Sequence, residues 1–281
     1  MAIRKPARFR ASCLQMNSGA DWQSNLREAK RLSEKALGGK PDLIALPENF
    51  LWRGPSRDLG AVARQGTPEA LEAFKSLARA SRTSFLLGSL LEPAGRGKVY
   101  NASFLIGPEG KLRAVYRKIH LFDIGLHRKL LVRESRHVES GYLPVVAAVS
   151  GVKVGLSICY DVRFPELYRY LAGRGCRILL VPSNFTRETG KAHWRVLLRA
   201  RAVENQAFVV APAQYGLHPE TGLPSFGHSL IVDPWGEILA DAGEKGSGVI
   251  MADLNLRKQA VLRERFPVLR HRRLTISPPK G

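Results

Sequence analysis

The sequence predicts an α/β fold in which two β-sheets pack face to face between outer helices, as a four-layer α-β-β-α sandwich. Two observations support this prediction. Short apolar or β-branched runs alternate with amphipathic stretches in the first half of the chain. The later strands instead follow one another as hairpins without crossover helices. Two layered sheets fit this order better than a single doubly wound sheet.

The first half of the chain alternates strand and helix. We expect strands at 8–16, 42–46, 84–90, 102–106 and 112–116, and helices at 22–37 and 67–79. Thr67 can cap the second helix, and Pro68 stands at its first position, where the missing N–H costs nothing. A turn at 107–110 joins two of the strands into a hairpin.

The second half begins with an irregular stretch at 122–144. We then expect strands at 145–149, 152–158, 177–182, 207–213, 225–232, 236–240 and 248–254, and helices at 165–171 and 191–206. Trp194 and Leu198 lie on the apolar face of the last helix. No linker or repeat divides the sequence, so we expect one domain over 1–281, with a core at about 9–273 and a basic C-terminal tail.

The composition is that of a globular protein. Of 281 residues, 44% are hydrophobic and 24% charged, which argues against disordered, collagen-like and coiled-coil proteins. The absence of an 18-residue apolar run and of a signal-like N-terminus leads us to expect a cytoplasmic protein without membrane contact. Cys13, Cys159 and Cys176 are too few and too irregularly spaced for a disulfide framework, so reduced thiols are expected.

The chain is strongly basic, with a formal net charge of +20 from 44 Lys and Arg against 24 Asp and Glu. Such a charge attracts anionic partners. The basic residues are scattered, however, without the pattern of an RRM, KH or helix-turn-helix module. Acidic small molecules are therefore favoured over nucleic acid, and an effect on solubility alone stays open.

Cys159 is the first candidate for a chemical role. It stands in GLSICYDVRFPE, at the end of a predicted strand and just before a helix whose N-terminus would favour a thiolate. The alternative is a small core residue. Cys13 lies inside a strand and Cys176 directly before one, and we interpret both as packing residues.

A cysteine that attacks an amide needs a base and a donor for the oxyanion. A histidine base, as in papain-like enzymes, stays open because such a pair cannot be recognised from sequence separation. Glu48 follows the strand at 42–46 and offers a carboxylate base. Lys118 follows another strand and could stabilise an oxyanion or lower the pKa of a neighbouring thiol. Each alone could be a solvated charge, but three complementary residues at strand ends favour catalysis.

Four motifs resemble, in order and spacing, those of the nitrilase superfamily of carbon–nitrogen hydrolases. They are LPENF around Glu48, YRKIHLFD around Lys118, RES around Glu134 and GLSICYDVRFPE around Cys159. The later segments AHWRVLLRARAVENQ, FGHSLIVDPWGEILA and FPVLRHRR look like the Nit amidase branch. The resemblance covers about 9–273.

The resemblance implies the same four-layer sandwich and a Glu-Lys-Cys triad, carried here onto Glu48, Lys118 and Cys159. Glu134 would support the lysine and the substrate, and Lys118 with the backbone N–H of Tyr160 would hold the oxyanion. The family needs no metal or organic cofactor. Its members usually form dimers through the helix after the nucleophile and the helix that maps to 191–206, so a homodimer or a higher homo-oligomer is expected.

For activity, the resemblance implies an amidase that releases ammonia from a small carboxylate-bearing amide through a cysteine thioester. A 2-oxo amide such as deaminated glutathione comes first and an omega-amidase substrate, 2-oxoglutaramate, second. Nitrile and N-carbamoyl hydrolysis are further alternatives. A catalytically inactive, basic nucleic-acid-binding protein on the same scaffold is an alternative of another class.

The candidate substrate-binding residues are Arg163, Asn184 and Phe185. Arg163 follows Cys159 by one helical turn and would meet a carboxylate, unless it pairs with Glu166 instead. Asn184 stands where the branch usually has alanine. The loop 122–133, with His127, Arg128 and Lys129, is also more basic than expected at a position that often guards the pocket.

Overall fold

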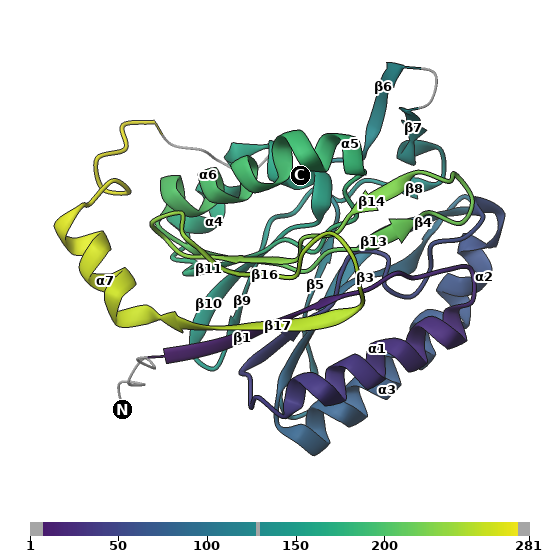
Figure 1. The fold of residues 1–281 in the computed structure, drawn as a ribbon, viewed down its shortest axis with the longest axis horizontal. Coiled ribbons are helices and arrows are strands. Elements are labelled where there is room, and N and C mark those ends of the chain that lie inside the picture. The colour runs from purple at the N-terminus through teal and green to yellow at the C-terminus, as the bar shows by residue number, and fades with distance from the viewer. Residues whose placement is uncertain (1–7, 128–129, 275–281) are drawn as a thin grey trace.

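The fold is a sandwich of two β-sheets between two layers of helices (Figure 1). The computed structural model describes residues 8–127 and 130–274. The first sheet has the order β17-β1-β2-β3-β4-β5, with β8 beside β4. Its strands are β1 (Arg8–Gln15), β2 (Leu43–Ala45), β3 (Ser84–Gly95), β4 (Lys98–Ile106), β5 (Leu112–Arg117), β8 (Val138–Glu139) and β17 (Gly248–Asn255).

The second sheet has the order β16-β15-β12-β11-β10-β9. Its strands are β9 (Val145–Val149), β10 (Val152–Leu156), β11 (Ile178–Leu180), β12 (Phe208–Ala211), β15 (Leu230–Val232) and β16 (Ile238–Asp241). Two hairpins lie outside the sheets: β6 (Asp123–His127) with β7 (Leu130–Arg133), and β13 (Tyr215–Leu217) with β14 (Pro224–Phe226).

The helices divide between the two outer faces (Figure 1). On the first sheet lie α1 (Trp22–Leu37), α2 (Leu59–Arg64) and α3 (Gly66–Ser81). On the second lie α4 (Pro165–Gly173) and α6 (Arg195–Asn205), with the short α5 (Arg187–Thr189) and a π-helical turn, Gly190–Trp194, before α6. α7 (Leu256–Arg265) follows the last strand. No helix in the described ranges is long and apolar enough to cross a membrane.

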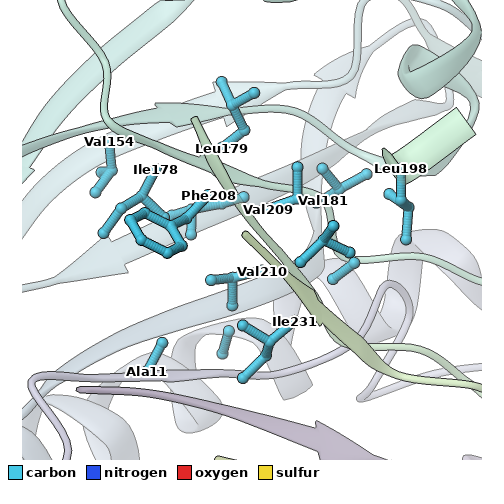
Figure 2. Close-up of a cluster of buried hydrophobic side chains, with 14 of the residues drawn as sticks. Ala11, Val154, Ile178, Leu179, Val181, Leu198, Phe208, Val209, Val210 and Ile231 are labelled. Atoms are coloured by element: carbon cyan, nitrogen blue, oxygen red, sulfur yellow. The ribbon is translucent and has the colours of Figure 1, made fainter. Parts of the chain in front are cut away.

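The main hydrophobic core lies between the two sheets because the inner face of each is apolar. Figure 2 shows Ala11 of β1 near Val210 of β12 and Ile231 of β15. Leu198 of α6 belongs to the same buried cluster, which continues onto the outer face of the second sheet. These side chains are buried. A second core fills the space between the first sheet and its helices.

The parallel strands bring the candidate residues to one end of the sandwich. β1, β2 and β3 run parallel in the first sheet, and β10, β11 and β12 in the second. Gln214, just after β12, donates hydrogen bonds to the side chain of Ser18 after β1 and to the backbone oxygen of Glu48 after β2, both at 3.0 Å. The carboxyl ends of strands from both sheets therefore meet there, as α/β binding sites require.

The predicted sandwich is confirmed, and so are most of its elements. The prediction of an irregular segment at 122–144 is wrong, because this stretch contains the β6–β7 hairpin and β8. This hairpin is largely exposed, and its strands are short and do not belong to either buried sheet. Arg128 and Lys129 of the basic loop lie outside the described residues, as do residues 275–281 of the predicted tail.

Helix starts and strand breaks account for the other differences. Thr67 does not cap α3, which begins at Gly66; its hydroxyl donates to the backbone oxygen of Leu91 at 2.8 Å. The predicted strand 225–232 is interrupted at Gly227 and His228, which both have a positive φ. The helix predicted at 191–206 begins with the π-helical turn. The prediction did not include α7.

Substitution of Gly88 by alanine tests how closely β3 approaches the segment that carries Glu48. A Cβ at this position would lie 1.8 Å from the backbone oxygen of Leu46, so the backbone must shift. We expect Gly88→Ala to lower the free energy of unfolding by about 3 kcal/mol. Urea denaturation followed by circular dichroism measures this change. Gly19→Ala is the control, because nothing lies within 4 Å of its Cβ; equal stability of both variants would contradict the prediction.

Candidate active site

Glu48 is held in a tight turn directly after β2. The next residue, Asn49, has a positive φ of 56°, and its N–H donates to the hydroxyl of Ser89 at 2.8 Å. The backbone oxygen of Glu48 accepts the bond from Gln214. The side chain of Glu48 is only 3% exposed. This carboxylate is therefore fixed from both sheets and removed from bulk water.

Lys118 lies between two carboxylates. Its Nζ is 2.9 Å from Oε1 of Glu48 and 2.9 Å from Oε2 of Glu134, and the lysine side chain is 2% exposed. Asn101 donates to both Glu48 and Glu134, at 3.0 and 3.2 Å. The backbone N–H of Phe122 donates to Glu134 at 2.6 Å. Nζ of Lys118 also donates to Oε1 of Glu134 at 3.1 Å, so its three hydrogen bonds all go to these two carboxylates.

Electrostatics keep Lys118 charged. Burial lowers its pKa, but the charges of Glu134 and Glu48 outweigh burial, and the pKa is raised well above its usual value. Lys118 therefore stays protonated at neutral pH. It can act as a fixed positive charge and hydrogen-bond donor, and not as a base.

Cys159 follows β10 at the first position of a short 3₁₀ turn, Cys159–Arg163. Its φ of 48° is unusual for a residue with a side chain. Its N–H donates to the backbone oxygen of Pro182 at 2.9 Å. The buried side chain of Asp161 stabilises the turn. It accepts hydrogen bonds from the N–H of Ile158 at 2.8 Å and from the hydroxyl of Tyr116 at 2.7 Å.

The thiol of Cys159 faces both Glu48 and Lys118. Burial raises the pKa of Cys159 and Glu48 adds to the increase, while Lys118 and a hydrogen bond from the backbone of Asn184 lower it. The resulting pKa of Cys159 lies well above its usual value. The decrease in thiol pKa that Lys118 was expected to cause is therefore smaller than the increase caused by burial and Glu48. A neutral thiol next to a carboxylate can react as a nucleophile when the carboxylate takes its proton.

A cavity of about 270 Å³ opens onto these groups, and Glu48, Lys118, Glu134 and Cys159 all line it. Its wall includes segments from both sheets and the β13–β14 hairpin. Within the described ranges, no cluster of three or more His, Cys, Asp or Glu has the arrangement of a metal site. The cavity therefore joins a thiol, a carboxylate and an ammonium, which is a set suited to acyl transfer.

The residues predicted to bind substrate differ in their relation to this cavity. Asn184, Phe185 and Tyr160 line it. Tyr160 is the second residue of the 3₁₀ turn, where backbone N–H groups lack a partner within the helix. Arg163 is not among the lining residues; its guanidinium lies over the rings of Tyr160 and Phe185 and beside His193. It forms no ion pair with Glu166, although both residues are described.

Comparison with known proteins agrees with this geometry. The family model for carbon-nitrogen hydrolases matches residues 10–264. The chain belongs to the carbon–nitrogen hydrolase family. A deaminated glutathione amidase from Synechocystis is 43% identical over 268 residues, which cover 94% of this chain and 98% of that protein.

Two further relatives place this carbon–nitrogen hydrolase in the Nit group of the nitrilase superfamily. An omega-amidase of Xenopus tropicalis is 36% identical over 95% of this chain and 96% of its own length. The crystal structure of the NitFhit protein of Caenorhabditis elegans matches with a TM-score of 0.89 and 38% identity, over 96% of this chain and 67% of that one. The chain is thus an enzyme that acts on carbon–nitrogen bonds of amides.

The residues of the cavity wall that sequence reasoning missed include Asn101, Arg53 and His218. Asn101 is a polar residue inside the apolar strand β4 and is 3% exposed. Its position within such a strand was a usable signal, because buried amides need partners. Arg53 and His218 stand in loops, where a sequence does not reveal which side chains turn inward.

Replacement of Glu48 by glutamine tests the carboxylate as the proton acceptor. The amide keeps the size and most contacts of the side chain but cannot take the thiol proton. We expect Glu48→Gln to lower kcat for amide hydrolysis by about 10³-fold, measured by release of the amine. Glu139→Gln removes an exposed carboxylate and should leave kcat unchanged. A Glu48→Gln enzyme with more than about a tenth of the normal kcat would contradict this role.

Proposed function

We propose that the chain is an amidase for a small carboxylate-bearing 2-oxo amide, of the kind present in deaminated glutathione, with Cys159 as the nucleophile. The observation that carries the proposal is the cavity in which the buried thiol faces Glu48 and the Lys118 ammonium. The similarity to a deaminated glutathione amidase over nearly the whole chain supports the substrate class.

In the first half of the reaction, Glu48 takes the proton of the Cys159 thiol as the sulfur attacks the amide carbon. The carbonyl oxygen becomes an oxyanion, which the ammonium of Lys118 and the backbone N–H of Tyr160 stabilise. Glu48 then gives its proton to the amide nitrogen. The carbon–nitrogen bond breaks, and the acyl group remains on Cys159 as a thioester.

In the second half, water attacks the thioester while Glu48 accepts a proton from it. The carbon–sulfur bond breaks, the carboxylic acid leaves, and the proton returns to the thiol. The leaving group depends on the substrate. A primary amide gives ammonia, whereas an amide whose nitrogen carries a peptide, as in deaminated glutathione, gives the amine of that peptide. Detection of ammonia alone would therefore miss the second kind of substrate.

The omega-amidase reaction on 2-oxoglutaramate is the second candidate, because an omega-amidase is 36% identical to this chain. Both substrates contain a 2-oxo acid and differ in what the amide nitrogen carries. We also propose a cytoplasmic setting. Its support is the thiol chemistry, because Cys13, Cys159 and Cys176 are all free and a reducing compartment keeps such thiols intact.

A substrate screen with a Cys159→Ala variant tests the proposal. The wild-type enzyme should hydrolyse 2-oxo amides with a carboxylate faster than nitriles or N-carbamoyl amines, and Cys159→Ala should lose at least about 10⁴-fold in kcat/KM. Mass spectrometry of the products detects ammonia, amine and acid alike. Cys176→Ala removes a buried thiol that does not line the cavity and should stay active. Tight RNA or DNA binding without any amide hydrolysis would instead favour a binding protein.

We propose that the enzyme forms a homodimer through the outer face of α6. The apolar face with Trp194 and Leu198 is buried within the chain and is not available to a partner. Val196, Val203 and Trp235 are instead exposed by 64%, 48% and 62%. Gly236, next to Trp235, lies against Val203, so α6 and this turn form one surface. Exposed apolar surfaces of this kind often mark interfaces.

A charge on this surface should prevent association. We expect wild-type protein to sediment as a dimer in analytical ultracentrifugation and Val203→Glu as a monomer, because the new carboxylate would be desolvated between apolar side chains. Leu112→Glu places the same charge on an exposed position of β5 and should remain dimeric. A wild-type monomer, or a dimeric Val203→Glu protein, would contradict this arrangement.

A further inference from the structure

Arg53 is a buried cation in the wall of the catalytic cavity that no carboxylate of the chain neutralises. Its residue is 2% exposed. The guanidinium donates to Asn17, Ser18, Tyr215 and Ser225, at 3.2, 3.5, 3.2 and 2.8 Å, and all four acceptor oxygens are neutral. No salt bridge joins Arg53 to any described residue, and the undescribed residues contain no Asp or Glu. A buried charge of this kind is costly unless a partner is supplied.

One edge of the Arg53 guanidinium is incompletely paired. Its Nε is buried and has no hydrogen-bond partner among the described residues. Elsewhere in the chain this edge binds carboxylates: Arg31 holds Glu28 through Nε and Nη2 at 2.7 and 2.8 Å, and Arg117 holds Glu92 at 2.6 and 2.9 Å. This two-point geometry is the one that suits a carboxylate best. Arg53 keeps the same edge without the anion.

The charge of Arg53 persists at neutral pH. Burial lowers its pKa to about 10, and Glu48 opposes this decrease. Arg53 therefore stays protonated at pH 7. The carboxylate of Glu48 is already bonded to Lys118 and Asn101, and it is the proposed base, so it alternates between charged and neutral during the reaction. It does not serve as a permanent partner for Arg53.

Hydrogen bonds connect Arg53 to the nucleophile. Nη2 of Arg53 donates to the hydroxyl of Ser225, which donates to the side-chain oxygen of Asn184 at 2.7 Å. The backbone N–H of Asn184 in turn bonds to the thiol of Cys159. Arg53 and Cys159 are thus two ends of one short polar wall. Both residues line the cavity of about 270 Å³, so a small substrate with an amide at one end and a carboxylate at the other can contact both from within it.

His218 adds a second donor from the β13–β14 hairpin. Its Nδ1 accepts from the backbone N–H groups of Glu220 and Thr221 at 3.3 and 3.4 Å, which leaves the proton of the neutral ring on Nε2. Burial, followed by the charge of Arg53, lowers the pKa of His218 to about 4. The ring is therefore neutral at pH 7, and it lines the cavity together with Arg53.

We infer that Arg53 is the residue that binds the carboxylate of the substrate, through its unpaired Nε and the neighbouring Nη2, with Ser225 positioning the guanidinium. Arg163, the arginine suggested by sequence, lies outside the cavity wall over two aromatic rings. This inference rests on the proposed amidase function. It assigns the selection of acidic amides to a residue five positions after the catalytic Glu48.

Two primary amides of equal chain length separate carboxylate binding from catalysis. Glutaramate carries a terminal carboxylate and pentanamide does not. We expect Arg53→Met to lower kcat/KM for glutaramate by about 100-fold, because a charge-assisted pair is lost. The value for pentanamide should change by less than about threefold, since the reacting groups remain. The readout is ammonia release, with thermal melting to verify the fold.

Two further variants control for net charge and for folding. Arg57→Met removes the same charge from an exposed side chain four residues away, and the glutaramate-to-pentanamide ratio should stay at the wild-type value. Arg53→Lys keeps a buried cation but loses the two-point edge. It should lower this ratio by about tenfold. If Arg53→Met does not fold, the ratio measured for Arg53→Lys tests whether Arg53 binds the carboxylate.

Three outcomes would overturn the assignment. Equal losses for both amides would make Arg53 a structural residue. An unchanged ratio in both Arg53→Met and Arg53→Lys would exclude it from substrate binding. Loss of the preference in Arg163→Met, but not in Arg53→Met, would move the carboxylate site to Arg163. A wild-type enzyme that hydrolyses no amide would instead refute the proposed function itself, which distinguishes the two failures.

Discussion

The active site depends on one ammonium buried between two carboxylates. Removal of three charges from water is costly, and such a group is stable only if its hydrogen bonds are well satisfied. Lys118, Glu48 and Glu134 meet this condition through Asn101 and the N–H of Phe122. The loops after β2 and β5 must therefore keep a single arrangement. Gln214 extends the same constraint to the second sheet through the backbone of Glu48.

Much of the fold could be predicted because its strands are apolar and its connections short. Ile178 to Leu180 and Phe208 to Ala211 are buried on both faces, so each is a continuous apolar run. The parts that were missed lack such a signal. The β6–β7 hairpin is largely exposed, and the break at Gly227 and His228 depends on backbone angles that a side-chain pattern does not record. The π-helical turn before α6 is tied to tertiary packing, since Gly190 lies directly against Phe226.

The sequence indicated Glu48, Lys118 and Cys159 because each follows a strand, and strand ends converge in a layered sheet fold. The four motifs then added Glu134. The sequence could not indicate Arg53 or His218, since nothing in their local sequence shows that a loop turns them into the cavity. Arg163 shows the opposite error, in which the sequence suggests a binding residue that does not line the cavity. Its position one turn after the nucleophile suggested a role in binding, but the turn directs its guanidinium onto the rings of Tyr160 and Phe185.

The backbone of Cys159 has a consequence for how the sequence can change over generations. A residue with a side chain at a φ of 48° is strained by about 1 kcal/mol or more relative to glycine. Glycine would adopt this angle without strain, but it has no side chain to carry the chemistry. Any residue with a Cβ at this position meets the same strain, so the backbone angle narrows the set of residues that can replace the cysteine.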